Sequence, residues 1–421
     1  MSDARKSLHV CLSSGRPGYG RAERWGEIKG GVMPRSAWIK RSIFAACMLA
    51  LIAAVVAGCG GGGSSSSSST SESEETAAGG GGGESEGGGE GVKIALLLPE
   101  NETPRYETND KPSFYKAVEE QCSGCEISYF NAGGDAEKQA GQGEAALTQG
   151  AEVLVVDPMD SKAAAVIVEK AHAQEVPTVS YDRLIENSEV AGYVSFDNER
   201  VGEQQAEKLS EKLKEIGSPK GPIIKINGDP ADPNAALFKS GSNKVFEKEG
   251  VEIAKEFDTP GWTAENAQKE ADQAITSLGK EGFAAIYAAN DETGGGAIAA
   301  MKGAGINPEE KPVTGQDSTV AGLQRILTGE QFMTIFKPIE PEAAIAAEMA
   351  ISLGETGEVK TKEPTEMIEN GKTEVPSILL TSTPVVKENI NETVIAEKFV
   401  TPAELCEGAF ATPCKEAGIS G

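Results

Sequence analysis

Charged and amide side chains recur at the ends of short apolar segments along the chain. They combine hydrogen-bond donors with acceptors, and hydrogen bonds to ionised groups are the strong ones. A tyrosine and a tryptophan among them supply flat apolar surfaces. A sugar presents hydroxyls in a plane and apolar C–H faces, so we expect these residues to form a sugar site. They are Arg105, Tyr106, Asp182, Arg183, Asp232, Asn234, Trp262, Asn290, Asp317 and Lys337.

The main alternative is an enzyme that hydrolyses a sugar. Such an enzyme needs a pair of carboxyl groups. Asp232 and Asp317 could supply such a pair. A carboxylate among arginines should stay ionised, however, and would be a poor acid. The chain also lacks a nucleophile elbow, a set of metal ligands and a cofactor loop. We therefore expect a binding protein with no catalytic residues, no cofactor and no metal.

Several of these positions have a second interpretation. Asp182 either contacts the ligand or orients Arg183, and the sequence leaves both open. The pair at 197–198 is typical of a helix N-cap and hinge. Glycines at 294–296 follow an Asn-Asp pair without the spacing of a phosphate-binding fingerprint, so a permissive turn explains them. The Asp-Pro pair at 157–158 is expected to turn the chain at the pocket edge.

Apolar strands and amphipathic helices alternate from residue 92 onward, which predicts a parallel sheet with helices on both faces. The first series has expected strands at 92–98, 126–130, 153–156, 178–181 and 192–194, and helices at 113–121, 136–148 and 161–173. The second has strands at 223–226, 251–257, 284–288, 313–315 and 332–336, and helices at 198–216, 234–248, 264–278, 293–304, 320–327 and 341–353. An irregular, mostly extended tail should follow.

Two such series predict an α/β fold with two doubly wound parallel-sheet lobes joined by a three-strand hinge. Ligands of open α/β sheets bind at the carboxyl ends of the strands, which is where the polar residues fall. We expect the crossovers of the hinge near 197–198, near 317–319 or slightly later, and at 337–338.

The N-terminal region carries an export signal. An apolar run at 42–58 follows Lys40 and Arg41, is shorter than a comfortable membrane span, and ends in Val-Ala-Gly before Cys59. This resembles a bacterial lipobox, which implies cleavage before Cys59 and lipid on its sulfur. A non-cleaved signal anchor is the alternative. Translation is expected to start at Met33, because the residues from there form a sensible basic leader.

A Gly/Ser/Glu segment follows Cys59 up to residue 91 and cannot bury apolar surface, so we expect a flexible tether. The net charge of the chain is −26. Removal of residues 1–58 leaves 30 basic and 62 acidic residues, a net charge of −32. That charge repels nucleic acid, which we exclude as a partner. The chain is expected to be extracytoplasmic, periplasmic or anchored to the outer face of the cell membrane as a lipoprotein.

Four cysteines remain after Cys59, in two close pairs: Cys122 with Cys125, and Cys406 with Cys414. An even number of cysteines in an exported protein suggests two local disulfides. A redox-active Cys-x-x-Cys is the alternative for the first pair, but its place between a helix and a strand favours a structural clip.

Seven short stretches carry a family resemblance, at 181–183, 195–199, 232–235, 261–262, 289–295, 315–317 and 336–338. In order and with few gaps, they resemble the D-xylose-binding proteins of ABC transporters, within the type I periplasmic binding proteins. The resemblance runs from about 92 to about 400. Tyr106 stands where the family commonly has tryptophan.

The resemblance implies that Arg105 and Arg183 bind sugar oxygens from one lobe, that Asp232, Asn234, Asn290 and Asp317 do so from the other, and that Lys337 reaches the sugar near the hinge. It implies a pentose ligand, an ABC permease and ATPase as partners, and a monomer. The expected parts are a removed region 1–58, a tether 59–91, a first lobe 92–198 with 337–354, a second lobe 199–336 with 355–400, and an extension 401–421.

Three other classes remain as alternatives. A binder of ribose, arabinose or glucose would use the same residue types. A sensor module for chemotaxis or a sensor kinase would have the same lobes. A sugar-responsive repressor would need a DNA-binding headpiece, whereas this chain begins with an export signal and a tether.

Overall fold

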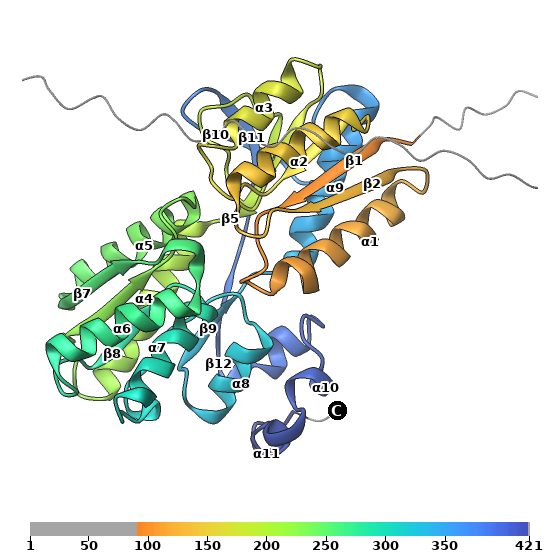
Figure 1. Cartoon of the computed structure of the whole chain (residues 1–421). Helices are drawn as coiled ribbons and strands as arrows, with labels where there is room; N and C mark the ends of the chain where they lie inside the picture. The colour runs from red at the N-terminus through yellow and green to blue at the C-terminus, as the bar shows by residue number, and fades with distance from the viewer. Residues whose placement is uncertain (1–90, 420–421) are drawn as a thin grey trace, which may run out of the picture. The chain divides into compact units, whose positions relative to one another are not determined.

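The computed structural model describes residues 91–419, which all belong to one compact unit (Figure 1). The expected removal of residues 1–58, the start at Met33, the lipid on Cys59 and the tether up to residue 90 lie outside the described residues. Between residues 91 and 419, no helix has both the length and the apolar character that crossing a membrane requires.

The first sheet has seven strands in the order β10–β11–β5–β4–β3–β1–β2. Their bounds are β1 (Lys93–Leu98), β2 (Glu126–Asn131), β3 (Val153–Val156), β4 (Thr178–Tyr181), β5 (Gly192–Phe196), β10 (Glu366–Glu369) and β11 (Glu374–Leu380). All neighbours pair in parallel except β10, which runs antiparallel to β11 at one edge. The central strands β3, β4 and β5 are buried throughout, as expected for a parallel sheet covered on both faces.

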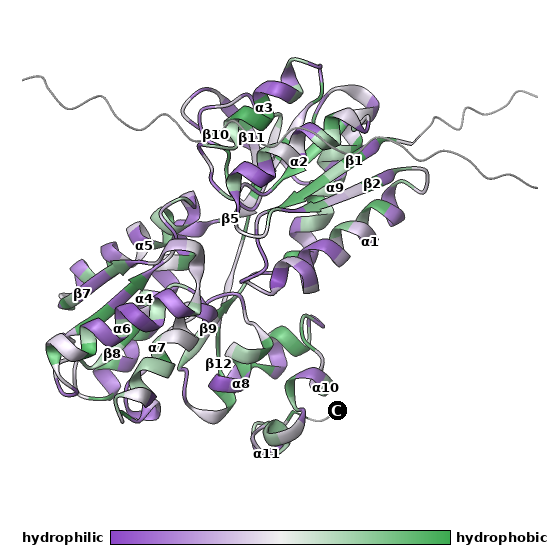
Figure 2. Cartoon of the chain, viewed as in Figure 1, coloured by the Kyte–Doolittle hydropathy of each residue, from purple (hydrophilic) through white to green (hydrophobic). Residues whose placement is uncertain are grey.

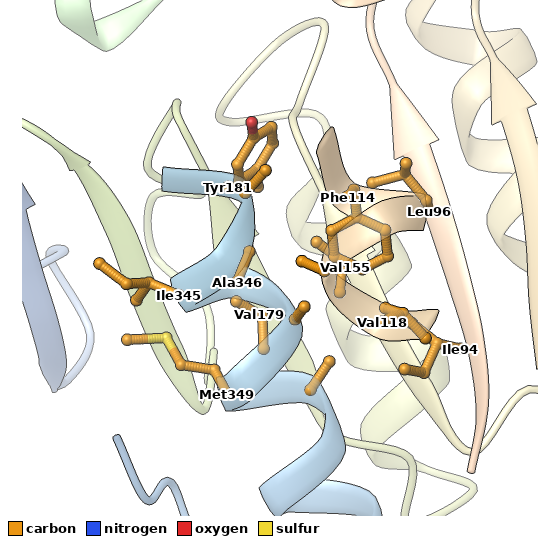
Figure 3. Packing of buried hydrophobic residues seen from close by; sticks show 14 of the residues in the cluster. Ile94, Leu96, Phe114, Val118, Val155, Val179, Tyr181, Ile345, Ala346 and Met349 are labelled. Atoms are coloured by element: carbon orange, nitrogen blue, oxygen red, sulfur yellow. The ribbon is translucent and has the colours of Figure 1, made fainter. Parts of the chain in front are cut away.

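Helices cover both faces of this sheet. On one face α1 (Lys111–Gln121) and α9 (Ile339–Thr356) bury Phe114, Val118, Ile345 and Met349 against the strands (Figure 3). On the other face lie α2 (Ala136–Thr148) and α3 (Ala165–His172). We call this sheet and these four helices the first lobe.

Helix α3 begins at Ala165, not at residue 161 as predicted. The Asp160 side chain accepts hydrogen bonds from the amides of Lys162 and Ala163, at 2.9 and 2.8 Å. Aspartate competes in this way with helical backbone bonding, so the chain closes a turn before the helix starts.

The second series forms a three-stranded parallel sheet and a separate antiparallel pair. The sheet has the order β7–β6–β8, with β6 (Ile223–Asn227), β7 (Ile253–Asp258) and β8 (Ala285–Ala288). The pair is β9 (Met333–Phe336) with β12 (Thr383–Val386).

The strand predicted at 313–315 is reduced to one bridge between Val313 and Ile286. The amide of Thr314 bonds the carbonyl of Ile286 at 3.2 Å. At Ala288 the hydroxyl of Thr314 takes over, because it bonds both the amide and the carbonyl of Ala288, each at 2.8 Å. Val313 still accepts a hydrogen bond from the amide of Phe332, so this segment connects β8 to the region of β9.

Five helices pack on these strands, and we call the assembly the second lobe. Helices α4 (Asn198–Glu215) and α5 (Pro233–Glu249) share one apolar cluster, and α6 (Ala264–Leu278) and α7 (Asp291–Gly303) share another. Helix α8 (Val320–Thr328) joins a third. These helices mix hydrophilic and hydrophobic residues along their length (Figure 2), as expected when one side faces a core.

The chain crosses between the lobes in three places. They are the junction of β5 with α4 at Phe196–Asn198, that of β9 with α9 at Phe336–Ile339, and that of β11 with β12 at Leu380–Thr383. The expected crossover at 317–319 is wrong. That turn stays in the second lobe, because the amide of Asp317 bonds the carbonyl of Ile335 at 2.9 Å.

The C-terminal part differs from the expected boundary, which placed residues 355–400 in the second lobe. Strands β10 and β11 lie in the first sheet, where β11 pairs with β5 and buries Val375 and Ile378. Only β12 and the residues after it lie with the second lobe.

The tail is less extended than predicted, because short helical turns follow β12, including α10 (Pro402–Leu405) and α11 (Ala411–Glu416). Leu405, Cys414 and Ile419 are buried in the cluster with residues of α8. The structure contains the disulfides Cys122–Cys125 and Cys406–Cys414, which clip the end of α1 to β2 and close the tail.

Candidate functional site

A pocket with a free volume of about 20 Å³ lies where strand ends of the two lobes meet. This is room for about one water molecule, so a larger ligand needs the lobes or these side chains to move apart. All ten residues predicted for the sugar site line it: Arg105, Tyr106, Asp182, Arg183, Asp232, Asn234, Trp262, Asn290, Asp317 and Lys337. Each of them is at most 5% exposed, so electrostatic interactions between them are screened little by water.

The pocket residues follow strands, as the fold requires. Arg105 and Tyr106 lie in the connection after β1, and Asp182 and Arg183 come directly after β4. In the second lobe, residues after β6 and β8 and before α8 contribute, and Lys337 comes directly after β9. Parallel strands bring their carboxyl ends to one edge of each sheet, which is why residues far apart in sequence converge.

Arg105 is held by carboxylates on several sides. Its Nη1 lies 2.9 Å from Asp182 Oδ2. Its Nε and Nη2 donate to both oxygens of Asp110, at 3.0 and 2.7 Å, and Nη2 also donates to Glu342 Oε2 at 3.4 Å. A two-point contact of this kind fixes the plane of the guanidinium group.

Neither Asp110 nor Glu342 lines the pocket, and sequence reasoning missed both as supports of Arg105. Both are buried, at 1% and 0% exposure. Burial raises the pKa of Glu342 well above its usual range, and the nearby Asp182 adds to this effect while Arg105 opposes it. Asp110 also accepts a hydrogen bond from the hydroxyl of Tyr181 at 2.7 Å.

Arg183 bridges the two lobes. Its Nη2 donates to the hydroxyl of Tyr106 at 2.9 Å, in the first lobe. Its Nε lies 3.0 Å from Asp232 Oδ2, in the second lobe. Asp157 lies behind it, with Oδ1 3.6 Å from the same Nε. Asp157 is fully buried and does not line the pocket, so it supports Arg183 from behind. The expectation that Asp157 lies at the pocket edge is wrong.

Asp182 adopts a left-handed backbone conformation, with φ of 54°. Hydrogen bonds hold its carbonyl oxygen in this conformation, from Ser195 Oγ at 2.5 Å and from the hydroxyl of Tyr193 at 3.2 Å. Its carboxylate lines the pocket and pairs with Arg105, not with Arg183. Its ion pairs are with Arg105 and Lys337, and both interpretations of Asp182, as a ligand contact and as a residue that orients Arg183, stay predictions.

Charge sets the ionisation of Asp182. Burial by itself would raise the pKa of this carboxyl, but the positive charges of Arg105, Lys337 and Arg183 outweigh burial and lower its pKa to about 2. Asp182 is therefore ionised at neutral pH and accepts hydrogen bonds only.

The start of α5 brings the second lobe to the first. Asp232 caps this helix and accepts a hydrogen bond from the amide of Asn234 at 2.8 Å. The Asn234 Nδ2 donates to the carbonyl oxygen and to Oδ1 of Asp182, at 3.1 and 3.0 Å. Burial raises the pKa of Asp232, and the positive charge of Arg183 opposes this effect.

Aromatic rings form two walls. Trp262 donates from Nε1 to Asp232 Oδ2 at 3.2 Å and meets Phe238 edge to face, with 6.3 Å between ring centroids. Gly228 makes room for Trp262, because a methyl group at Gly228 would overlap the indole ring. The second wall is in the first lobe, where the centre of the Tyr106 ring lies 5.2 Å from the guanidinium carbon of Arg105.

Asp317, Lys337 and Asn290 complete the lining. Lys337 Nζ lies 3.0 Å from Asp317 Oδ1. Asn290 caps α7, where its Oδ1 accepts from the amide of Thr293 at 2.9 Å, so this side chain has a structural role as well as a place in the pocket. The expected helix cap at Asp197 is also present, because its side chain accepts from the amide of Arg200.

Sequence reasoning missed Thr103, Phe238 and Gln316 in the pocket lining. Phe238 follows Asn234 by one turn of α5, and this spacing was a usable signal. Thr103 and Gln316 are polar residues in connections, where the sequence does not fix orientation. Among buried atoms of the described residues, Asn234 Oδ1 and Gln316 Oε1 accept no hydrogen bond.

The pocket therefore combines three cationic groups, three carboxylates, amides and aromatic faces. Each cation has a carboxylate within 3.0 Å, at Asp182, Asp232 or Asp317. Such a set can donate to and accept from several hydroxyls at once. It favours a neutral, polyhydroxylated small molecule over a strongly charged one.

A periplasmic binding protein domain model matches residues 94–358 of this chain. The D-xylose-binding periplasmic protein of Escherichia coli strain K12 is 35% identical over 318 residues, covering 75% of this chain and 92% of that protein. The D-xylose-binding periplasmic protein of Haemophilus influenzae is 33% identical over 314 residues, covering 74% and 91%.

The fold also matches solved structures. An ABC transporter solute-binding protein from Clostridium phytofermentans with bound β-D-glucose has a TM-score of 0.67 at 28% identity, covering 74% of this chain and 99% of that one. These matches include the strands that carry the pocket residues, because the family model alone spans β1 to α9.

Proposed function

The chain belongs to the periplasmic binding protein domain family, and we propose from this premise that it binds D-xylose in the pocket between its two lobes. It is a binding protein of the ABC transporter class and not an enzyme. The ten residues predicted from sequence are the proposed contacts of the sugar.

One observation carries the proposal. Residues from seven separate connections, predicted from their types and positions alone, line a single buried pocket. Two relatives over 30% identical across most of their length are D-xylose-binding proteins, which supports a pentose.

The pocket suggests how binding proceeds. Arg105, Asp182 and Arg183 present charged groups from the first lobe, and Asp232 and Asn234 present polar groups from the second. A sugar that bonds to both sets stabilises the arrangement in which the lobes meet, which is ligand-driven closure. Tyr106 and Trp262 cover the C–H faces of the sugar.

We place the protein outside the cytoplasm, as its family implies. Cys59 is the proposed lipid attachment site, and residues 59–91 are the proposed tether to the membrane. We propose that the protein is a monomer and delivers sugar to the permease and ATPase subunits of a sugar importer.

Metabolic labelling tests the lipid anchor. We expect wild-type cells to incorporate radiolabelled palmitate into the protein, and cells that carry Cys59→Ser not to do so.

A second candidate ligand is D-glucose. The observation that favours it is the glucose bound to the Clostridium phytofermentans protein, whose fold matches this chain at 28% identity. A glucose ring carries one more hydroxymethyl group than xylose, so the space at one end of the pocket decides between them.

A thermal-shift panel of monosaccharides separates the candidates, because a ligand that binds only the folded chain raises its melting temperature. We expect D-xylose to raise the melting temperature at lower concentrations than D-glucose, D-ribose or L-arabinose. A larger response to glucose would replace xylose by the second candidate. No response to any sugar would contradict sugar binding.

A further inference from the structure

Asp291 is a fully buried carboxylate one residue beyond the pocket. It is the first residue of α7, directly after Asn290, and it does not line the pocket. Nothing in the proposed sugar contacts uses it. Its burial requires that other groups in the second lobe bond to it.

The carboxylate of Asp291 accepts hydrogen bonds from two separate segments. Oδ2 accepts from the amide and the hydroxyl of Thr319, at 2.9 and 3.2 Å. Oδ1 accepts from Gln331 Nε2 at 2.6 Å. The backbone of Asp291 adds two more links, because its amide donates to the carbonyl of Gln316 at 3.1 Å and its carbonyl accepts from Arg325 Nη2 at 2.6 Å.

The segment that Asp291 holds is strained. Asp317 and Ser318 both adopt positive φ, of 84° and 49°, which is costly for residues other than glycine. Successive backbone amides hold this turn. The amide of Asp317 bonds the carbonyl of Ile335, that of Ser318 bonds Thr334 Oγ1 at 3.1 Å, and that of Thr319 bonds Asp291.

Two glycines fit around the carboxylate. A methyl group at Gly315 would overlap Asp291 Oδ1, and one at Gly322 would overlap Oδ2. Neither glycine has positive φ, so close approach to the carboxylate accounts for the absence of a side chain at both positions. Asp291 is thus enclosed by backbone on two sides.

We infer that Asp291 is a positioning residue, whose carboxylate locks the strained turn at Asp317–Thr319 to the start of α7 and so fixes Asp317 and Asn290 in the sugar site. The inference rests on the proposed function for its sugar readout. Its mechanical part, the lock between Asp291 and the turn, does not.

The burial of Asp291 makes the lock sensitive to pH. Burial raises the pKa of this carboxyl to about 6, while Arg325 on α8 and the hydrogen bonds from Gln331 and Thr319 oppose burial, and Asp317 adds to it. Burial also raises the pKa of Glu292, the next residue of α7, and the charges of Asp291 and Asp317 add to this effect. Protonation removes an acceptor, so sugar affinity is expected to fall as pH decreases through about 6.

Stability should respond in the opposite direction. The pKa of Asp291 is raised above that of an unfolded aspartate, so its contribution favours the folded state at low pH and is lost as pH rises through about 6. If Asp291 only supported the fold, a change in pH would change sugar affinity and stability in the same direction. Opposite trends, both absent in Asp291→Asn, would mark a positioning role.

Hydrogen exchange tests the lock without any sugar. We compare the wild type, Asp291→Asn and Asp258→Asn, a control in the same lobe whose carboxylate pairs with Lys239 near the surface. Asp291→Asn should speed exchange of the Ser318 and Thr319 amides about tenfold, and the control should not. Unchanged exchange in Asp291→Asn would overturn the inference.

Calorimetry tests the consequence for the sugar. Loss of a buried hydrogen bond to a charged group is worth about tenfold or more in affinity, so Asp291→Asn should weaken D-xylose binding by about tenfold. Sugar binding by the wild type at pH 6 should release protons, and by the variant should release fewer. The wild type and variant are compared because other buried carboxyls also titrate.

Gly322→Ala keeps the inference testable if Asp291→Asn does not fold, because it displaces the carboxylate without changing charge. It should produce the same faster exchange and weaker binding. Faster exchange with unchanged sugar affinity would overturn the positioning role and leave sugar binding intact. A wild type that binds no monosaccharide would refute the proposed function, and hydrogen exchange would then decide the lock alone.

Discussion

Asn234 shows how one side chain serves both lobes. It lies in the first turn of α5, where the cap at Asp232 sets the direction of the helix start. Its Nδ2 bonds Asp182 across the pocket, and its Oδ1 is a buried acceptor without a hydrogen bond. A buried acceptor of this kind is a natural partner for a ligand hydroxyl.

Asn234→Ala is predicted to weaken sugar binding at least about tenfold, because it removes a buried donor and acceptor at once. Asn307→Ala is the matched control, since Asn307 is an exposed asparagine of the same lobe and lies outside the pocket. Isothermal titration of both variants is the measurement. Wild-type affinity in Asn234→Ala would remove this residue from the proposed site.

The contribution of Asp182 to the stability of the fold should depend on pH. Its pKa in the folded chain is lowered to about 2, below the unfolded value, so it stabilises the fold above about pH 4 and this stabilisation is lost as pH falls through 2. The difference in unfolding free energy between wild type and Asp182→Asn should therefore shrink by about 1 kcal/mol between pH 5 and pH 3.

Denaturant unfolding at each pH measures this difference. Asparagine tolerates the left-handed backbone at this position, so the substitution changes charge with little strain. Asp135→Asn is the control, because Asp135 is an exposed cap of α2 and asparagine caps helices equally well. A pH-independent difference for Asp182→Asn would contradict the lowered pKa.

Residue types and strand ends predicted which side chains meet, but not their partners. Arg105 and Asp182 were expected in one pocket, yet their ion pair depends on side-chain directions that sequence spacing does not fix. Asp110, Glu342 and Asp157 support the arginines from behind, and no pattern distinguishes them from surface carboxylates.

At the scale of elements, glycines allow α4 and α5 to pack closely. A methyl group at Gly202 would overlap the carbonyl of Phe238, and one at Gly241 would overlap the carbonyl of Glu199. Because α5 begins with Asp232 and Asn234, its distance from α4 sets where these side chains reach the pocket.

Gly202→Ala is predicted to destabilise the chain by about 1–3 kcal/mol, the usual cost of overpacking, because backbone atoms must move. Gly141→Ala is the control. Gly141 lies in α2 with open space around it, so alanine there should stabilise the helix by about 0.5–1 kcal/mol. Equal effects of the two substitutions in thermal unfolding would contradict the close helix contact.

Most helices and strands were predictable because their apolar patterns are local. The boundaries that failed depend on distant partners. Strand β11 has an apolar pattern that would suit either sheet, and only its pairing with β5 assigns it to the first. The segment at 313–315 has strand-like residues, but its backbone pairing ends at Ile286, because the Thr314 hydroxyl bonds both backbone groups of Ala288.

At the scale of the whole molecule, the crossovers place polar groups of both lobes around one pocket. Lys337 lies in a crossover itself, paired with Asp317 of the second lobe and 4.0 Å from Asp182 of the first. Bonds from a ligand to both lobes would therefore act on the segments that connect them. This is the physical basis for the proposed coupling of sugar binding to closure.

The most direct test of this account is a calorimetric titration of the purified chain with D-xylose at neutral pH. We predict saturable binding of one sugar per chain, with the sugar recovered unchanged. Absence of saturable binding by D-xylose and by every other monosaccharide tried would contradict it.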